Sequence, residues 1–363
     1  MRYVLSLILL AHGLVHLMGF TKAFGLGRMA QLTRQISRIE GTAWLVASTL
    51  FVLGGLLFFL ENGYWPIVVL AAIVVSQLLI AVAWKDAKFG TLVNGILLVA
   101  VILGWGGQRF ESGFAKDVKS NLGIPGEAGV ALLTEADIKD LPLPVQKYIR
   151  YSGSLNQPKV KNVRIVFDGN MRGKGEDWFG FGSLQYNFFA APSRFFFMKA
   201  RKWGMPVMGY HRYADGKAGM DIRLLGLVPV AQASGPEMDK AETVTFFNDM
   251  CMFVPAALID KRIEWLPIDK NSAHATFKNG PNLVSATLYF NEDGQLVNFV
   301  SDDRYDINEK KQYRFSTPLA NYKLVGGRHL PTYGEGVWHY PDGKFTYGKF
   351  YLKDIEYNVG SFH

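Results

Sequence analysis

The residues with the clearest capacity for chemistry are two histidines in the apolar N-terminal stretch LILLAHGLVHLMGF. Because they are four positions apart, His12 and His16 lie on one face of a helix, and two imidazoles in that arrangement can chelate a metal ion. No Cys, Asp or Glu at mid-depth of another apolar segment supplies a third ligand, and haem takes its two axial histidines from opposite sides of the ring. We therefore expect no cofactor, but hydrogen bonds from the pair to Gln77, Asn94 or backbone. A metal or haem site at this pair is the alternative.

A second group of chemically capable residues is the acidic sequence SDDRYD in the C-terminal half of the chain. On a strand, Asp302, Arg304 and Asp306 share one face, and an ion-pair ladder is the ordinary role of such a pattern. Carboxylate pairs can also serve as general acid and base, and the sequence PEMDKAE adds two glutamates. The candidate catalytic residues of a hydrolase or transferase acting on a membrane-derived substrate are therefore Asp302, Asp303, Arg304, Glu237 and Glu242.

The signature motifs of common enzyme classes do not occur in the sequence. It contains no G-x-S-x-G elbow, Walker loop, H-E-x-x-H pair or C-x-x-C pair. The single cysteine, Cys251, excludes an internal disulfide, and its apolar neighbours predict a buried, unreactive thiol. Whether the protein is an enzyme stays open at this point.

Charge and composition narrow the classes of partner. The chain has 363 residues and a formal net charge of +8. A basic chain can bind nucleic acid, but the Lys and Arg residues form no cluster and no nucleic-acid motif is present. The scattered basic residues favour contact with anionic lipid headgroups, so a membrane is an expected partner and nucleic acid is not. An apolar molecule is expected as a further partner from the aromatic residues described below.

The elements that position these residues begin with four apolar segments, at residues 3–24, 41–60, 65–84 and 91–106. Their lengths are near the ~20 residues that a transmembrane helix needs. Tyr and Trp residues lie at their ends, as in the aromatic belts of membrane proteins. Residues 1–107 are therefore predicted to form a four-helix transmembrane region.

Basic residues in the short loops predict the orientation of these helices. Lys22, Arg28, Arg34 and Arg38 lie between the first two segments, and the loop ENGYWP that follows the second segment carries no Lys or Arg. Positively charged loops face the cytoplasm. The expected location is a bacterial inner membrane, with the C-terminal domain facing the periplasm or the cell exterior.

The remainder of the chain reads as a linker, residues 108–132, and an extracytoplasmic domain, residues 133–363. About a dozen segments alternate polar and apolar residues, as in VKNVRIVFDG, and Asp-Gly pairs at 215, 293 and 342 predict hairpin turns. Helices are expected at PVQKYIRYSG and within GPEMDKAETVTFFNDMCMFVPAALI. We expect an α+β, mostly antiparallel domain whose sheet is strongly curved or a half-barrel, with one or two packed helices.

Aromatic residues concentrate in the sequence NFFAAPSRFFFMKARKW and just after it. Consecutive residues of a strand point to opposite faces, so one face can be core and the other can line a ligand cavity. The expected wall of a cavity for a lipid or another hydrophobic ligand is Phe195, Phe197, Trp203, Met208, Tyr210 and Tyr213.

Four segments resemble the hallmark sequences of a bacterial family known only as a domain of unknown function. They are LPLPVQKYIRYSG, MGYHRYADGKAGMDIRLLGLVPVAQASGPE, FFNDMCMFVPAALID and LPTYGEGVWHYPDG. The resemblance covers roughly residues 133–358, and members commonly carry N-terminal membrane spans. It implies no reaction and no catalytic residue.

A looser likeness, in strand order and aromatic wall, points to the periplasmic lipoprotein carriers. Those proteins are β half-barrels closed by helices that hold acyl chains. What this likeness implies is a fold only.

Overall fold

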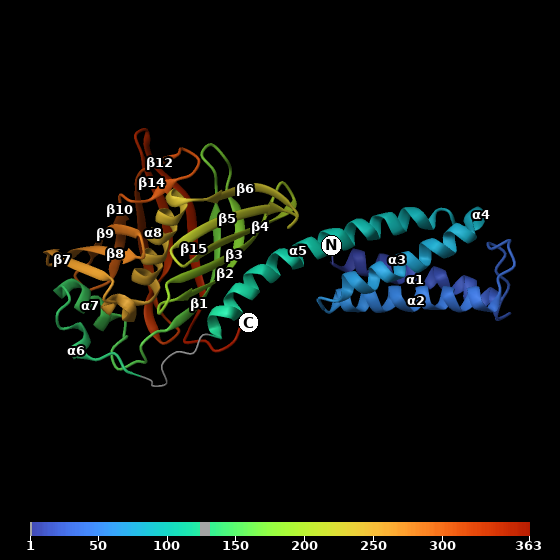
Figure 1. Cartoon of the computed structure of the whole chain (residues 1–363), viewed down its shortest axis with the longest axis horizontal. Coiled ribbons are helices and arrows are strands. Elements are labelled where there is room, and N and C mark those ends of the chain that lie inside the picture. The colour runs from blue at the N-terminus through green and yellow to red at the C-terminus, as the bar shows by residue number, and fades with distance from the viewer. Residues whose placement is uncertain (1, 124–130) are drawn as a thin grey trace. The chain divides into compact units, whose positions relative to one another are not determined.

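The computed structural model describes residues 2–123 and 131–363, in two compact units, Met1–Phe110 and Glu111–His363 (Figure 1). Each unit is considered by itself. The N-terminal unit is helical, and the C-terminal unit is built on one large sheet.

The N-terminal unit holds the expected apolar helices. They are α1 (Arg2–Ala23), α2 (Arg38–Phe59), α3 (Trp65–Val82), the short α4 (Trp84–Ala87) and α5 (Gly90–Leu122). Ser37 caps α2 in a capping box with Glu40, and Pro66 stands in the first turn of α3, where its missing N–H costs nothing. Four of these helices are long and apolar enough to cross a membrane.

Helix α5 runs beyond the end predicted from hydropathy. The linker was expected to begin at residue 108, but the chain stays helical to Leu122. No proline interrupts this stretch, and its Phe114 and Val118 are buried in the C-terminal unit. Tertiary packing thus extends the helix through a polar sequence. Residues 124–130 of the expected linker lie outside the described residues.

The C-terminal unit contains a 13-stranded antiparallel sheet with the order β6-β5-β4-β3-β2-β1-β15-β14-β13-β10-β9-β8-β7. A separate hairpin pairs β11 with β12. The strands are β1 (Asn162–Met171), β2 (Phe179–Phe188), β3 (Ser193–Lys202), β4 (Met205–Ala214), β5 (Lys217–Leu224), β6 (Val228–Ser234), β7 (Ile263–Asp269), β8 (Ser272–Asn279), β9 (Asn282–Phe290), β10 (Leu296–Ser301), β11 (Tyr305–Asp306), β12 (Lys311–Gln312), β13 (Arg314–Val325), β14 (Arg328–Tyr340) and β15 (Gly343–Tyr357).

The three Asp-Gly pairs lie where hairpin turns were predicted. Asp215 and Gly216 join β4 to β5, both with positive φ (55° and 69°), which is the geometry that a two-residue type I′ turn requires. Gly294, in the β9–β10 connection, and Gly343, the first residue of β15, also have positive φ. Local turn chemistry therefore fixes these strand pairings.

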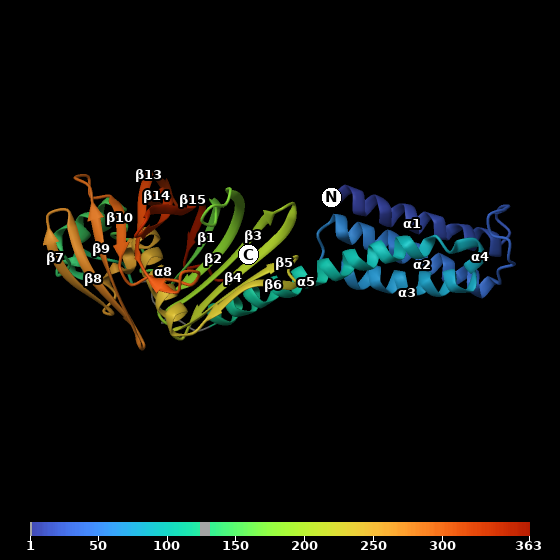
Figure 2. The same ribbon diagram turned by 90° about the horizontal axis from the view of Figure 1, so that it is seen from above.

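The helices of this unit are α6 (Glu135–Ile138), α7 (Leu143–Tyr151), α8 (Pro236–Phe253) and the 3-10 helix η1 (Pro255–Ile259). Helix α8 contacts β4, β5 and β6 as well as β9, β10 and β14, so it lies against both halves of the sheet (Figures 1 and 2). The main core forms around it, with Phe246, Phe247 and Met250 fully buried. Cys251 is likewise buried, and burial raises the pKa of its thiol.

The sheet corrects one expectation. A strongly curved sheet or half-barrel was predicted, but the sheet is neither closed nor strongly curled, with β6 and β7 at opposite ends of the strand order. The bulk of α8 between the two halves of the sheet explains this, because a tighter curl would need the space that this helix occupies. The large antiparallel sheet itself is as predicted.

Candidate functional site

A cavity of about 610 Å³ lies beside α8 in the C-terminal unit. Its volume falls within the range typical of small-molecule sites. Most of its lining is apolar and comes from the inner face of the sheet, for example Phe196, Met198, Met220, Phe350 and Leu352. Helix α8 contributes Met238, Ala241 and Met252 from the other side.

The period-two alternation of β3 decides which aromatic residues reach the cavity. Arg194, Phe196 and Met198 line it, whereas the intervening Phe195 and Phe197 are buried and do not. The sequence SRFFFMK contains apolar residues at both parities, so its hydrophobicity alone cannot tell the two faces apart. The signal that was missed is Arg194, which marks the face with the polar groups.

Most of the six predicted wall residues therefore lie elsewhere. Phe197 stacks on Phe114 of α5, with ring centroids 5.4 Å apart, and the hydroxyl of Tyr210 donates to Asp117 Oδ2 at 2.7 Å. Helix α5 thus covers this face of the sheet, where the registers of Phe195 and Met208 also place them.

The other two predicted wall residues differ from each other. Tyr213 is buried in the main core, 2.8 Å from Thr243 Oγ1, and does not line the cavity. Trp203 does line it, in the turn between β3 and β4, and is 76% exposed. Of the six predicted residues, the structure brings only Trp203 to the cavity.

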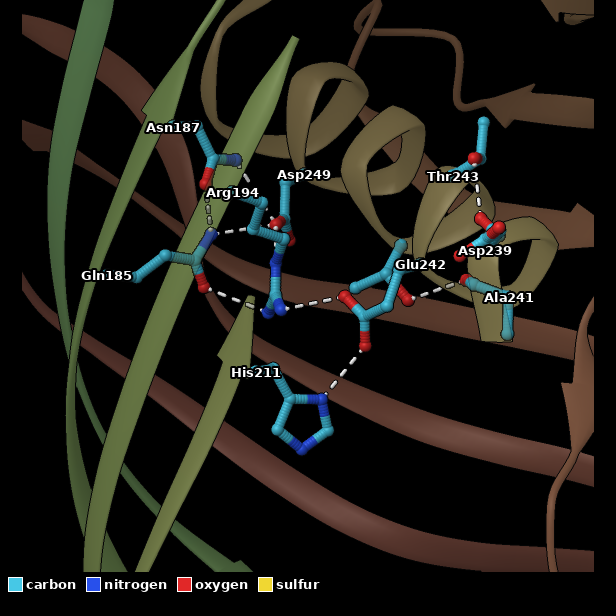
Figure 3. Close-up of polar contacts among 10 residues, drawn as sticks. Gln185, Asn187, Arg194, His211, Asp239, Ala241, Glu242, Thr243 and Asp249 are labelled. Atoms are coloured by element: carbon cyan, nitrogen blue, oxygen red, sulfur yellow. Dashed lines mark hydrogen bonds and ion pairs between the residues drawn. The ribbon is translucent and has the colours of Figure 1, made fainter. Parts of the chain in front are cut away.

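A buried polar cluster forms one part of the cavity wall and is centred on Arg194 (Figure 3). Arg194 Nε donates to Asp249 Oδ2 at 2.7 Å, and its Nη1 donates to Glu242 Oε2 at 3.1 Å. Gln185 accepts from Arg194 Nη2 at 3.0 Å and donates to Asp249, as does Asn187. Arg194, Glu242 and Asp249 are only 7%, 4% and 5% exposed. These three charged side chains are therefore buried, and their ion pairs with one another offset part of the lost hydration.

Electrostatics keep the carboxylate of Glu242 ionised. Burial by itself raises the pKa of Glu242, but the Arg194 guanidinium and the hydrogen bond to His211 outweigh burial and lower that pKa to about 2. At neutral pH Glu242 is therefore an acceptor only.

His211 is oriented by this carboxylate. Its Nδ1 lies 2.9 Å from Glu242 Oε1 (Figure 3), and because an ionised carboxylate can only accept, Nδ1 carries the proton. Within the described part of the chain no side chain or backbone group bonds to Nε2 of His211, which lines the cavity. This nitrogen can accept a hydrogen bond from a ligand.

The acidic sequence SDDRYD does not form the expected ladder. Strand β11 covers only Tyr305 and Asp306, so the segment is not one continuous strand. Asp302 pairs with Arg314 at 2.8 Å, and Asp303 pairs with Lys240 at 2.8 Å and accepts from Ser285. Each carboxylate has its own structural partner.

The remaining catalytic candidates also separate. Arg304 and Asp306 line the cavity, but Glu237 is exposed in the first turn of α8. Asp306 accepts from the hydroxyl of Tyr340 and from the backbone N–H of Asn308. The structure does not assemble Asp302, Asp303 and Glu237 around one point, whereas Glu242, on the same helix as Glu237, belongs to the polar cluster.

The two histidines of the N-terminal unit make the expected hydrogen bonds. His12 Nε2 lies 3.0 Å from Asn94 Oδ1, and His16 bonds to the carbonyl of His12 at 2.8 Å and to Ser76 Oγ at 2.9 Å. Gln77 reaches the network only through Asn94. The structure shows no group of three or more His, Cys, Asp or Glu residues that could hold a metal ion among residues 2–123 and 131–363.

Of three comparisons with known proteins, the match to a family model agrees with the family resemblance noted in the sequence. No curated protein matches the chain. A LolA superfamily protein from Nitrosomonas europaea aligns with a TM-score of 0.30 and 9% identity, over 60% of this chain and 92% of that one. A family model described as a family of unknown function, DUF6544, matches residues 131–350, which is more than half of the chain. The chain therefore belongs to the DUF6544 family.

Proposed function

We propose that the C-terminal unit binds a lipid or another apolar small molecule in the cavity beside α8. The observation that carries this proposal is the cavity itself, about 610 Å³ in volume, with a mostly apolar wall that includes Phe, Met and Leu side chains. Burial of methylene groups against such a wall contributes about 0.8 kcal/mol each, so about ten of them offset the ~8 kcal/mol of micromolar binding.

The membrane helices supply a reason for this ligand class. Four helices are long and apolar enough to span a bilayer, which would hold the β unit where lipids are abundant. Four basic residues in the first loop, Lys22, Arg28, Arg34 and Arg38, favour the cytoplasmic side for that loop. We infer a bacterial inner-membrane protein whose cavity faces the periplasm or the cell exterior.

A binding assay on the full chain tests the proposal. The protein is placed in lipid nanodiscs and titrated with the apolar fluorophore N-phenyl-1-naphthylamine, with empty nanodiscs as the blank. Thr245 lines the cavity from α8, and the larger ring of Thr245→Phe should fill part of the cavity and reduce saturable binding at least fivefold. The matched variant Thr276→Phe, on β8 and away from the cavity, should bind as the wild type does.

Native mass spectrometry of the purified chain gives an independent readout. The proposal expects an apolar molecule to co-purify with the wild type and to be reduced in Thr245→Phe. If the wild type shows neither a co-purifying molecule nor saturable fluorophore binding above the blank, the proposal is wrong.

A further inference from the structure

The charged groups that line the cavity are not equally satisfied. Arg194 forms ion pairs with both Glu242 and Asp249, and Lys202 pairs with Glu176 at 2.7 Å. In contrast, the guanidinium of Arg304 makes no ion pair or hydrogen bond with any group among the described residues, and its charge acts on the cavity only at longer range, where it helps to lower the pKa of Glu242. Its N–H groups are therefore unpaired hydrogen-bond donors at the cavity wall.

Aromatic stacking holds Arg304 at this position. Its guanidinium carbon lies 4.0 Å from the ring centroid of Phe315 and 5.5 Å from that of Trp338. All three residues line the cavity. A guanidinium stacked on rings is fixed in place through its flat face, while its N–H groups around the edge stay available for a planar or tetrahedral anion.

A second unsatisfied polar atom lies nearby. Asn248 of α8 is 5% exposed, and its amide donates to Thr317 Oγ1 at 2.8 Å, but its Oδ1 has no partner. Phe315 and Thr317 stand two positions apart on the same face of β13, a spacing of about 6.8 Å. Arg304 contacts Phe315 and Asn248 bonds to Thr317, so the two side chains border the cavity at neighbouring positions along β13.

The carboxylates of the cavity are, by comparison, already used. Asp249 accepts from Arg194, Gln185 and Asn187, and Glu242 accepts from Arg194 and His211. Asp306 accepts from Tyr340, and Glu335 accepts from Tyr333 and Thr346. A cationic head group would find these acceptors engaged, whereas an anionic one would find free donors at Arg304.

We propose that the ligand is an amphiphile with an anionic head group, a carboxylate or a phosphate, that binds to Arg304 beside Asn248 while its apolar chain lies among the Phe and Met side chains of the cavity. This inference rests on the proposed function and narrows it to one class of ligand. Arginine matches both head groups because its N–H donors can engage two oxygens at once.

Displacement of N-phenyl-1-naphthylamine from the full chain in phosphatidylcholine nanodiscs tests the inference, with decanoate, decyl phosphate and 1-decanol as competitors at pH 8. The three share one alkyl chain and differ in the head group. We expect both anions to bind at least tenfold more tightly than the alcohol, after correction for partition into empty nanodiscs. Arg304→Gln should abolish that difference, and an unchanged circular dichroism spectrum checks that the variant is folded.

A matched variant separates this site from general surface charge. Arg314→Gln removes the same charge ten residues along the chain, but Arg314 pairs with Asp302 and does not line the cavity, so the preference for anions should persist. Equal binding of decanoate and decanol to the wild type, or an unchanged preference in Arg304→Gln, would overturn the inference while leaving the proposed function intact. If neither the fluorophore nor any of the three competitors binds to the protein, the proposed function is instead overturned.

Inorganic phosphate distinguishes an amphiphile from a free anion. We expect phosphate alone to displace no fluorophore and to bind far more weakly in calorimetry than decyl phosphate does. If phosphate binds as tightly as decyl phosphate, and Arg304→Gln abolishes that binding, the site recognises a free anion and the proposal of an amphiphilic ligand is wrong.

Discussion

The helical unit and the β unit each bury a polar network, and the two networks differ in charge. In the helical unit, His12, His16, Ser76 and Asn94 form a network of neutral groups. In the β unit, Arg194, Glu242 and Asp249 place three charges within hydrogen-bonding distance of one another. Neutral groups cost little to bury once they are bonded, whereas ions lose much more hydration.

This difference in charge indicates which of the two networks is not explained by the stability of the fold alone. Well-packed apolar residues often stabilise a core as well as a buried ion pair does. A charged cluster that forms part of a cavity wall is therefore better explained by the cavity than by stability. None of the four residues of the histidine network lines this cavity. Hydrogen bonding between helices is therefore a sufficient explanation for that network.

The largest expected effect follows from breaking the charged network. Arg194→Met leaves Glu242 and Asp249 buried without a cation, which should cost the β unit about 3–5 kcal/mol. Hydrogen exchange of α8 peptides in the full chain measures this loss. The control Lys270→Met breaks an ion pair with Glu292 on the surface and should cause no measurable change. Normal protection of α8 in Arg194→Met would contradict this explanation of the cluster.

Acid should act on the same network with a slightly smaller effect. The pKa of Glu242 is lowered from 4.5 to about 2, so between these values the unfolded chain binds a proton that the folded chain does not. The stabilisation, about 3 kcal/mol, is therefore complete above pH 4.5 and is lost as the pH falls toward 2. Unfolding of the β unit by urea at several pH values measures this slope.

Two variants of α8 identify the source of the pH dependence. Glu242→Gln should flatten the slope between pH 4.5 and 2.5, because the titrating group is gone. Thr245→Val, one turn away on the same helix, contains no ionisable group and should keep the wild-type slope. Identical slopes in the two variants would assign the acid sensitivity to other carboxylates.

Much of the fold could be predicted from the sequence because its signals are local. Four long apolar segments, alternating residues and Asp-Gly pairs each act within a few residues, and the structure has the four helices and the antiparallel sheet they predict. The extension of α5 to Leu122 could not be predicted, since it depends on the burial of Phe114 and Val118 by distant strands. The openness of the sheet likewise depends on where α8 packs.

The candidate site was less predictable because it depends on long-range pairing. Gln185, Arg194, His211 and Glu242 come from β2, β3, β4 and α8, and no spacing in the sequence connects them. The aromatic run on β3 was recognised, but a strand buried on both faces gives no indication of which face borders a cavity. Arg304 was identified within an acidic motif, whereas its aromatic partners Phe315 and Trp338 become neighbours only through the sheet.

Breaking the neutral network should have a smaller effect than breaking the charged one. Asn94→Leu removes hydrogen bonds to His12, Ser76 and Gln77, and polar contacts between membrane helices contribute about 0.6–1.7 kcal/mol. We therefore expect a loss of about 1–2 kcal/mol in the unfolding of the helical unit, measured in bicelles. Thr49→Val, whose hydroxyl bonds only within its own helix, serves as the control. A loss as large as that of Arg194→Met would contradict the contrast between the two networks.

The smallest expected effect concerns the turn that carries Trp203. Trp203 and Gly204 form a two-residue hairpin loop with φ values of 53° and 76°, a geometry that favours Asn-Gly over Trp-Gly. Trp203→Asn should therefore stabilise the β unit by up to about 1 kcal/mol, because Asn tolerates the left-handed conformation better than Trp does. The same variant removes a residue that lines the cavity, so the affinity for N-phenyl-1-naphthylamine should fall a few-fold. A gain in stability with unchanged binding would mean that this exposed indole serves neither the hairpin nor the ligand.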